Sequence, residues 1–263
     1  MPYPQFDRHV VKMLPLSTRV NKNQIERDHV RVDAAPQKLT EVAKKVIAEA
    51  VERIVEARRQ DAPVMLTFGA HSIKNGLALV MIELMEAGWI THLATNGAGI
   101  IHDWEVAFQG QSSEDVEGYV KQGQFGNWEE TGRNINLALN IGAYEGKGYG
   151  ESVGVFIENE GGDVPDAAAL LAEINTYAAD DPARAARAAD LLSIIKRFDL
   201  PAGRLEVPHP WKRFSVQAAA YRLGVPSPGH PTSGPHLIHT HPTTPGNQHP
   251  PSPLRASAAS ADP

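Results

Sequence analysis

The most regular pattern of apolar residues lies between residues 40 and 60. Aliphatic side chains recur there at steps of three and four residues: Val42, Val46, Ile47, Ala50, Val51, Ile54 and Val55. This spacing places them on one face of a helix. Thr40 suits the N-terminal cap, and the carboxylate of Glu41 favours the positive end of the helix dipole. The pattern predicts an amphipathic helix over residues 40–60.

Two short apolar runs flank a second helical pattern. Residues 63–68 (PVMLTF) and 90–95 (ITHLAT) predict strands, and the first run is apolar enough for a strand covered on both faces. Residues 73–87 predict a helix that is apolar nearly all round and therefore buried, ending where Gly88 permits a left-handed conformation. A strand, helix, strand unit of this kind predicts parallel strands and a right-handed crossover.

The remaining patterns predict one more strand and six more helices. Residues 152–157 (SVGVFI) form an apolar run that is typical of a strand. The helical patterns cover residues 102–108, 113–121, 128–144, 165–178, 182–198 and 211–223. We therefore expect an α/β fold, a Rossmann-like parallel sheet flanked by helices, in one domain over residues 40–224.

The two ends of the chain lack these patterns. Residues 1–39 are polar with scattered prolines, which predicts an extended arm on the surface or on a neighbouring subunit. Residues 225–263 are rich in Pro, His, Ser and Thr, and we expect them to form a disordered C-terminal tail because they can bury little apolar surface. The abrupt change at Val225 leaves open a fused or frameshifted tail.

Composition narrows the classes of partner. The 263 residues carry a formal net charge of -6 from mixed acidic and basic side chains, so we expect no nucleic-acid partner. The absence of cysteine excludes disulfides and thiolate nucleophiles. No run reaches the roughly 18 apolar residues of a membrane helix, and we expect a cytoplasmic protein without a membrane partner.

Histidines are frequent near the C-terminus. Clustered imidazoles can bind zinc or nickel. They stand in a proline-rich segment that would hold them poorly, so we expect no metal site. The histidines concerned are His230, His236, His239, His241 and His249.

The string of residues 95–105 (TNGAGIIHDWE) follows the second strand of the unit and opens a helix. Gly97 and Gly99 would let the backbone approach a pyrophosphate, and the first N–H groups of the helix favour negative charge. The string is half of a G-x-G-x-x-G fingerprint, since His102 replaces the last glycine. A turn that merely needs a flexible backbone is the alternative.

A second polar loop, residues 69–76 (GAHSIKNG), follows the first strand. The carboxyl ends of parallel strands meet at one edge of a sheet, which is where open α/β sheets bind ligands. Side chains from this loop suit ribose hydroxyls or phosphates, although they would equally cap and solvate the next helix. These side chains belong to His71, Ser72, Lys74 and Asn75.

The two loops together resemble the cofactor loops of the deoxyhypusine synthase family. The matching strings are LTFGAHSIKNG and ATNGAGIIHDWE, and the later strings at 123–125 (GQF) and 132–136 (GRNIN) are similar to further segments of that family. The resemblance covers residues 61–140. It implies an enzyme that uses NAD, a transferase acting on a polyamine or another small amine, in an assembly of several copies.

The resemblance also assigns residues to the cofactor. Ala70 and His71 take the place of the family's Ser-Asn pair, and residues 96–98 take the place of its Thr-Ala-Gly turn. Ile101 and His102 stand where the family carries paired glutamates, and nothing near the C-terminus matches its reactive lysine, since Lys212 follows a tryptophan without the family's glycine. The expected cofactor-binding residues are Ala70, His71, Ser72, Asn75, Asn96, Gly97, Ala98 and Gly99.

A second resemblance concerns the start of the helix after the second strand. Asn96, the string His102-Asp103-x-Glu105 and the Gly-x-Ser that ends at Ser112 are similar to the ornithine cyclodeaminase domain of bifunctional arginine-degrading enzymes. Both families begin by oxidising an amine with NAD. We nominate His102 as the base because imidazole titrates near neutrality, with Asp103 or Glu105 binding the amine. The alternative is a homologue that binds NAD, or has a structural role, without catalysis.

Overall fold

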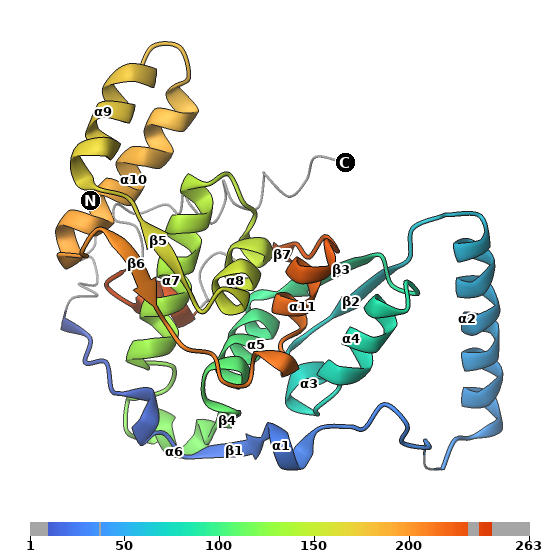
Figure 1. Ribbon diagram of the computed structural model, residues 1–263. Helices are drawn as coiled ribbons and strands as arrows, with labels where there is room; N and C mark the ends of the chain where they lie inside the picture. The colour runs from blue at the N-terminus through green and yellow to red at the C-terminus, as the bar shows by residue number, and fades with distance from the viewer. Residues whose placement is uncertain (1–9, 37, 231–236, 244–263) are drawn as a thin grey trace, which may run out of the picture.

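A computed structural model of the chain describes residues 10–36, 38–230 and 237–243. It is an α/β protein with a parallel sheet among helices (Figure 1). The sheet has the order β2-β3-β7, so that β3 (His92–Asn96) lies between β2 (Met65–Phe68) and β7 (Gly229–His230), parallel to both. The predicted fold class is confirmed, and so is the parallel pairing of the first two predicted strands.

The connection between β2 and β3 holds two helices where one was predicted. They are α3 (Ala70–Lys74) and α4 (Ala78–Glu86). The break falls at Gly76, which has φ +76° and lies so close to the backbone of Asp28 and His29 that a side chain would not fit. Gly88 has φ +72°, which confirms the predicted left-handed end of the second helix.

Helix α4 is buried on one face only, and strand β2 is not covered on both faces. The inward face of α4 carries Ala78, Met81, Ile82 and Met85, whereas Leu84 is 36% exposed. Met65 of β2 is 60% exposed because it lies on the uncovered face of the strand, where Thr67 is exposed too, whereas Leu66 and Phe68 on the other face are half-buried. The apolar runs therefore predicted the right type of element, a helix and a strand, but the predicted extent of burial is wrong.

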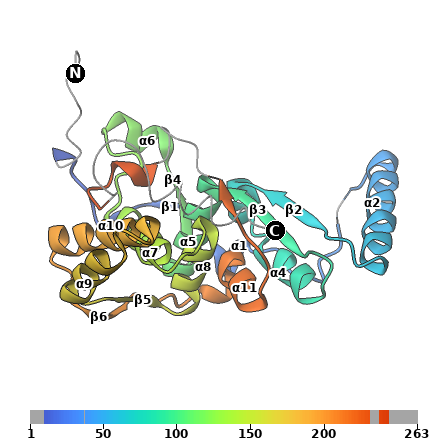
Figure 2. The same cartoon turned by 90° about the horizontal axis from the view of Figure 1, so that it is seen from above.

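Helix α2 (Glu41–Arg59) confirms the first helical pattern. The hydroxyl of Thr40 accepts the N–H of Ala43 at 3.1 Å, as expected for the cap. No residue of α2 is buried, and Val42 and Val46 are 74% and 59% exposed. Figures 1 and 2 both place α2 apart from the body of the protein. Within the described residues, the apolar face of α2 is therefore uncovered. The expected assembly of several copies stays a prediction.

The predicted strand over residues 152–157 is wrong, because these residues belong to helix α8 (Tyr149–Glu158). Seven of the ten residues of α8 are buried: Tyr149, Gly150, Ser152, Val153, Gly154, Phe156 and Ile157. A short helix with so little polar surface has the same continuous apolar run as a buried strand. A Cβ on Gly154 would lie 2.6 Å from the carbonyl oxygen of Gln217, so the glycine allows the neighbouring helix to approach closely.

The other predicted helices are present with small changes. The bounds predicted for residues 182–198 coincide with α10, whereas residues 113–121 begin in a strand and residues 211–223 are divided by a 3-10 turn at Lys212–Phe214. A separate antiparallel pair joins β5 (Gly161–Val164) and β6 (Gly203–Glu206). The remaining elements are α5 (Gly97–Gln109), β4 (Gln111–Glu114), α6 (Val116–Lys121), α7 (Glu129–Tyr144), β5 (Gly161–Val164), α9 (Ala167–Tyr177), α10 (Pro182–Phe198), β6 (Gly203–Glu206) and α11 (Val216–Leu223).

Hydrophobic side chains form two packed groups. The larger group surrounds Trp104 and Phe156, and draws on α5, α7, α8 and α10. The smaller group surrounds Leu93 of the central strand, with side chains from α4 and α11. Helix α5 contributes to both groups, so its position is fixed from two sides. Within the described ranges, no helix is both long and apolar enough to cross a membrane.

The N-terminal residues are more than a surface arm. After a 3-10 turn at Leu16–Thr18, strand β1 (Asn21–Gln24) pairs antiparallel with β4, and a helical turn, α1 (Ile25–Asp28), follows. Leu16 is 1% exposed and Arg19 is 7% exposed. The prediction of a surface segment is wrong for this part of the chain, because its isolated apolar residues have no period that would reveal their burial.

Part of the predicted disordered tail also belongs to the fold. Strand β7 pairs with β3, and a 3-10 turn at Leu237–Thr240 lies against α7, where the side-chain amide of Asn136 donates to the carbonyl of Ile238 at 2.9 Å. Ile238 is 2% exposed. The prediction of disorder is wrong for residues 225–230 and 237–243. Residues 231–236 and 244–263, with His236 and His249, lie outside the described residues.

A substitution at Gly99 tests the packing of α5 on the sheet. A Cβ on Gly99 would collide with the hydroxyl of Thr95 on β3, which itself donates to the carbonyl of Phe68. We expect Gly99→Ala to lower the free energy of unfolding by about 1–3 kcal/mol, the usual cost of overpacking. Urea denaturation measures it. Gly69→Ala is the matched control, since a Cβ there meets only the Asn96 amide at an ordinary 3.6 Å; equal stability of both variants would contradict the packing.

Candidate functional site

The loops after β2 and β3 lie at the same edge of the sheet, as predicted. The register pairs Phe68 with Thr95, so both strands end at one level. A Cβ on Gly69 would be 3.6 Å from the side-chain nitrogen of Asn96, which shows that the two connections are neighbours. Each connection leads directly into a helix, α3 or α5.

The predicted cofactor residues after β3 form the first turn of α5. The side chain of Asn96 is exposed at the rim and accepts the N–H of Gly99 at 2.9 Å. Gly99 is buried against Thr95, and its N–H is occupied by this cap. Capping and packing therefore account for both residues, and a diphosphate could not use the amide of Gly99 unless Asn96 moved. Gly97 is buried, whereas Ala98 is exposed and lines a cavity.

The predicted cofactor residues after β2 lie in and just after α3. His71 and Asn75 are exposed, and Ala70 and Ser72 are half-buried. The N–H groups of Ser72 and Asn75 serve the local turn, since they donate to the carbonyls of Gly69 and His71 at 3.1 and 2.9 Å. Exposed side chains at this rim thus come from both loops.

A cavity of about 270 Å³ opens beside this rim. Five parts of the chain contribute to its walls: the N-terminal segment, α3, α5, the region from β4 to α7, and residues 238–241. The polar and charged groups on its walls include Arg19, Lys74, His102, Glu105, Glu114 and His241. The N-terminal segment and residues 238–241, which were expected to lie outside the folded domain, therefore help to form the walls of the site.

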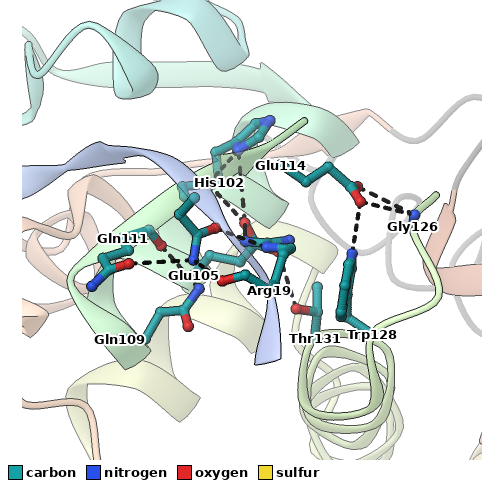
Figure 3. A network of polar contacts seen from close by, with 11 residues as sticks. Arg19, His102, Glu105, Gln109, Gln111, Glu114, Gly126, Trp128 and Thr131 are labelled. Atoms are coloured by element: carbon teal, nitrogen blue, oxygen red, sulfur yellow. Dashed lines mark hydrogen bonds and ion pairs between the residues drawn. The ribbon is translucent and has the colours of Figure 1, made fainter. Parts of the chain in front are cut away.

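A buried ion pair between Arg19 and Glu105 contributes to the lining of this cavity, and Figure 3 shows the contacts of the pair. Two parallel hydrogen bonds of 2.7 Å join the guanidinium to the carboxylate, and both side chains are 2% exposed. The carboxylate also accepts the hydroxyls of Ser112 at 2.7 Å and Thr131 at 3.1 Å. With four donors around it, Glu105 is committed to these protein groups and does not bind an amine directly.

His102 is linked to this pair through Ser112. Its Nδ1 lies 2.5 Å from the hydroxyl oxygen of Ser112. Because that hydroxyl donates its only proton to Glu105, it accepts from His102, and the network therefore assigns the proton of the imidazole to Nδ1. Nε2 is then left with a lone pair, which is the arrangement of a general base.

The environment keeps His102 neutral near neutral pH. Burial lowers the pKa of His102 to about 4; the charge of Glu105 raises this pKa, and the charges of Lys74 and Arg19 lower it. Burial acts to raise the pKa of Glu105, but the charge and hydrogen bonds of Arg19 and further donors outweigh it, so the pKa of Glu105 is lowered. An uncharged imidazole thus stands one hydroxyl away from an ionised carboxylate.

Asp103 is not brought to the cavity. Its side chain is fully buried, where it accepts the hydroxyl of Ser215 at 2.6 Å and the N–H groups of Val216 and Gln217 at 2.8 and 3.2 Å. It caps the start of α11. Burial raises the pKa of Asp103, although these donors act to lower it. The prediction of a catalytic or amine-binding Asp103 is therefore corrected to a structural role.

Lys212, compared above with the reactive lysine of the resembled family, also lies elsewhere. Its ammonium donates to the carbonyl of Glu158 at 2.9 Å, at the end of α8. It is not among the residues that line the cavity.

The sequence interpretation missed several polar residues of the site, among them Arg19, Glu114 and Thr131. Glu114 accepts the indole N–H of Trp128 at 2.9 Å and the N–H of Gly126 at 3.2 Å, and burial raises the pKa of this carboxyl. Arg19 is 86 residues from Glu105 in the chain. No local pattern links residues so far apart, so only the fold could have paired them.

Removing the guanidinium tests the buried ion pair. We expect Arg19→Met to lower the free energy of unfolding by about 3–5 kcal/mol, because Glu105 would remain as an uncompensated buried charge. Chemical denaturation at neutral pH measures this loss. The double variant Arg19→Met, Glu105→Gln removes that charge and should recover part of the loss. A double variant no more stable than Arg19→Met would show that the pair's charge is not what matters.

Burial of His102 predicts a dependence of stability on pH. The unfolded imidazole has a pKa near 6.5 and the folded one near 4, so the unfolded state binds more protons between these values and stability falls as the pH falls from 6.5 to 4. His209 behaves alike, with its pKa lowered by burial to about 4. We expect His102→Gln to reduce the loss of stability between pH 7 and pH 5 by about 2 kcal/mol. Urea denaturation at both pH values measures it, and an unchanged loss would mean that the pKa of His102 is not lowered.

Comparison with known proteins adds no relative. No protein-family model, no curated protein and no solved structure matches this chain. The resemblance to deoxyhypusine synthase therefore stays a prediction made on residues 61–140, and the interpretation of function rests on the site itself.

Proposed function

We propose that this protein is an NAD-dependent enzyme that oxidises a small amine, a transferase of the deoxyhypusine synthase type, with His102 as its base. The observation that carries the proposal is the position of His102. Its Nδ1 is engaged by Ser112, which leaves Nε2 as the basic nitrogen of a residue that lines a cavity beside the carboxyl edge of a parallel sheet. That edge is where α/β proteins bind nucleotide cofactors.

The rim is compatible with NAD. Gly69 has no neighbour closer than 3.6 Å to its missing Cβ, and the exposed His71, Asn96 and Ala98 lie on the two adjoining connections. A cavity of about 270 Å³ is at the small end of ligand pockets and suits the nicotinamide end together with a small substrate. The rest of the dinucleotide would be held by residues of the exposed rim. When bound, NAD accepts a hydride from the carbon that bears the amine.

The protein's own part in this chemistry is the movement of a proton. A protonated amine must lose a proton before its carbon can give up a hydride, and Nε2 of His102 would accept it. Burial disfavours the resulting imidazolium, since it lowers the pKa of His102 to about 4, and the charge of the ionised Glu105 offsets part of this effect. Ser112 holds the ring orientation during this change.

A cyclodeaminase-like reaction is a second candidate, because one observation favours it. Of the string that resembles the ornithine cyclodeaminase domain, His102, Glu105 and Ser112 form one continuous chain of hydrogen bonds. The non-catalytic alternative is supported by Lys212, which lies outside the cavity, so that the lysine of the transfer reaction has no counterpart there.

Formation of NADH tests the proposed function. The full chain is titrated with NAD by calorimetry, and a panel of small amines, including spermidine and ornithine, is then added while NADH absorbance is followed. We expect turnover with at least one amine, and a loss of about 100-fold to 10,000-fold in kcat for His102→Gln because the base is removed.

The control is His92→Gln, a histidine at the opposite end of β3, half-buried beside Thr91. This variant should keep its activity. Binding of NAD without turnover would favour the non-catalytic alternative, and failure to bind NAD would contradict both readings.

A further inference from the structure

Two charged side chains face the cavity without an ionic partner. Lys74 ends α3 and Glu114 ends β4, and both are half-buried. Among the residues that the structure describes, neither forms a salt bridge, although Arg19 and Glu105, which line the same cavity, pair with each other. A charge that is partly withdrawn from water without a partner costs free energy. An ammonium and a carboxylate without ionic partners suit a ligand that carries both a negative and a positive group.

The carboxylate of Glu114 is held in a fixed orientation. The indole of Trp128 and the N–H of Gly126 donate to it, and Figure 3 shows this group beside the network of His102 and Glu105. Lys74 lies on α3, lines the same cavity, and is close enough for its charge to act on the imidazole. The base is thus accompanied by one positive and one negative group.

These charges distinguish between two classes of substrate. The Arg19–Glu105 pair is neutral as a whole, so Lys74 and Glu114 leave the cavity with one charge of each sign. A polyamine carries several positive charges, and one of them would meet Lys74. Resting on the NAD-dependent amine oxidation of the proposed function, with water taking the place of the acceptor in the transfer step, we infer that the substrate is a small α-amino acid, with its carboxylate bound by Lys74 and its ammonium group bound by Glu114.

The reaction then takes place at the α-carbon. The ammonium group would lose a proton to His102, and NAD, when bound, would take the hydride of the α-carbon, so that a carbon-nitrogen double bond, NADH and a protonated imidazole would result. Addition of water to this imine and departure of ammonia give a 2-oxo acid. Two electrons pass from the substrate to NAD, and no further oxidant is needed.

Two matched pairs of ligands test the inference by binding. The pairs are 2-aminobutyrate with propylamine and ornithine with putrescine, and the members of each pair differ only in the α-carboxylate. Calorimetry with the full chain, with and without NAD, should give at least tenfold tighter binding of the amino acid in both pairs. Lys74→Gln should abolish this preference, whereas Glu114→Gln should weaken both members of each pair. Lys44→Gln, an exposed lysine of α2, is the matched control and should change nothing.

Other outcomes overturn the inference. Equal or tighter binding of the amine that lacks the carboxylate does so, and so does a preference that survives in Lys74→Gln. Binding of inorganic phosphate that depends on Lys74, with no binding of amino acids, would assign this lysine to the cofactor instead. NADH formation is followed separately. Turnover of putrescine or propylamine in preference to the amino acids would support the proposed function but contradict an amino-acid substrate. Carboxylate-dependent binding without NADH formation would support the amino-acid site but contradict the proposed function.

Discussion

The buried ion pair of Arg19 and Glu105 is the interaction on which the rest of the site depends. It joins the N-terminal segment to α5, and through Ser112 and Thr131 it reaches β4 and α7. Each of these groups is needed to satisfy the carboxylate, since an ionised group in the core is tolerated only when it is paired and hydrogen-bonded. The orientation of His102 follows from this constraint, because Ser112 can accept from the imidazole only while it donates to Glu105.

Helix α5 connects the fold to the chemistry because its faces have different tasks. His102 and Glu105 are three residues apart and share the face that looks toward the cavity. Asp103 and Trp104 point to other sides, where one caps α11 and the other is fully buried in the larger hydrophobic group. Residues that are adjacent in the sequence of a helix therefore point in different directions and can have unrelated roles.

The sequence was informative where a signal is local. The period of α2 with its Thr40 cap, the strand, helix, strand unit, and the common edge of the two loops all follow from short-range patterns, and His102 and Glu105 could be selected at that edge. It failed where a partner decides the outcome. The apolar run at 152–157 is a helix because packing surrounds it, and residues 225–230 are ordered because β3 offers an edge for pairing. Arg19 and Glu114 act through contacts that no spacing of residues in the sequence predicts.

The hydrogen bonds of Ser112 assign the proton of His102 to Nδ1 and leave a free electron pair on Nε2. Nuclear magnetic resonance of the imidazole nitrogens, with His102 assigned by comparison with His102→Gln, measures this state directly. We predict a neutral ring protonated at Nδ1 at pH 7, which takes up a second proton only well below pH 6.5. A ring protonated at Nε2, or a doubly protonated ring at pH 7, would contradict the central claim.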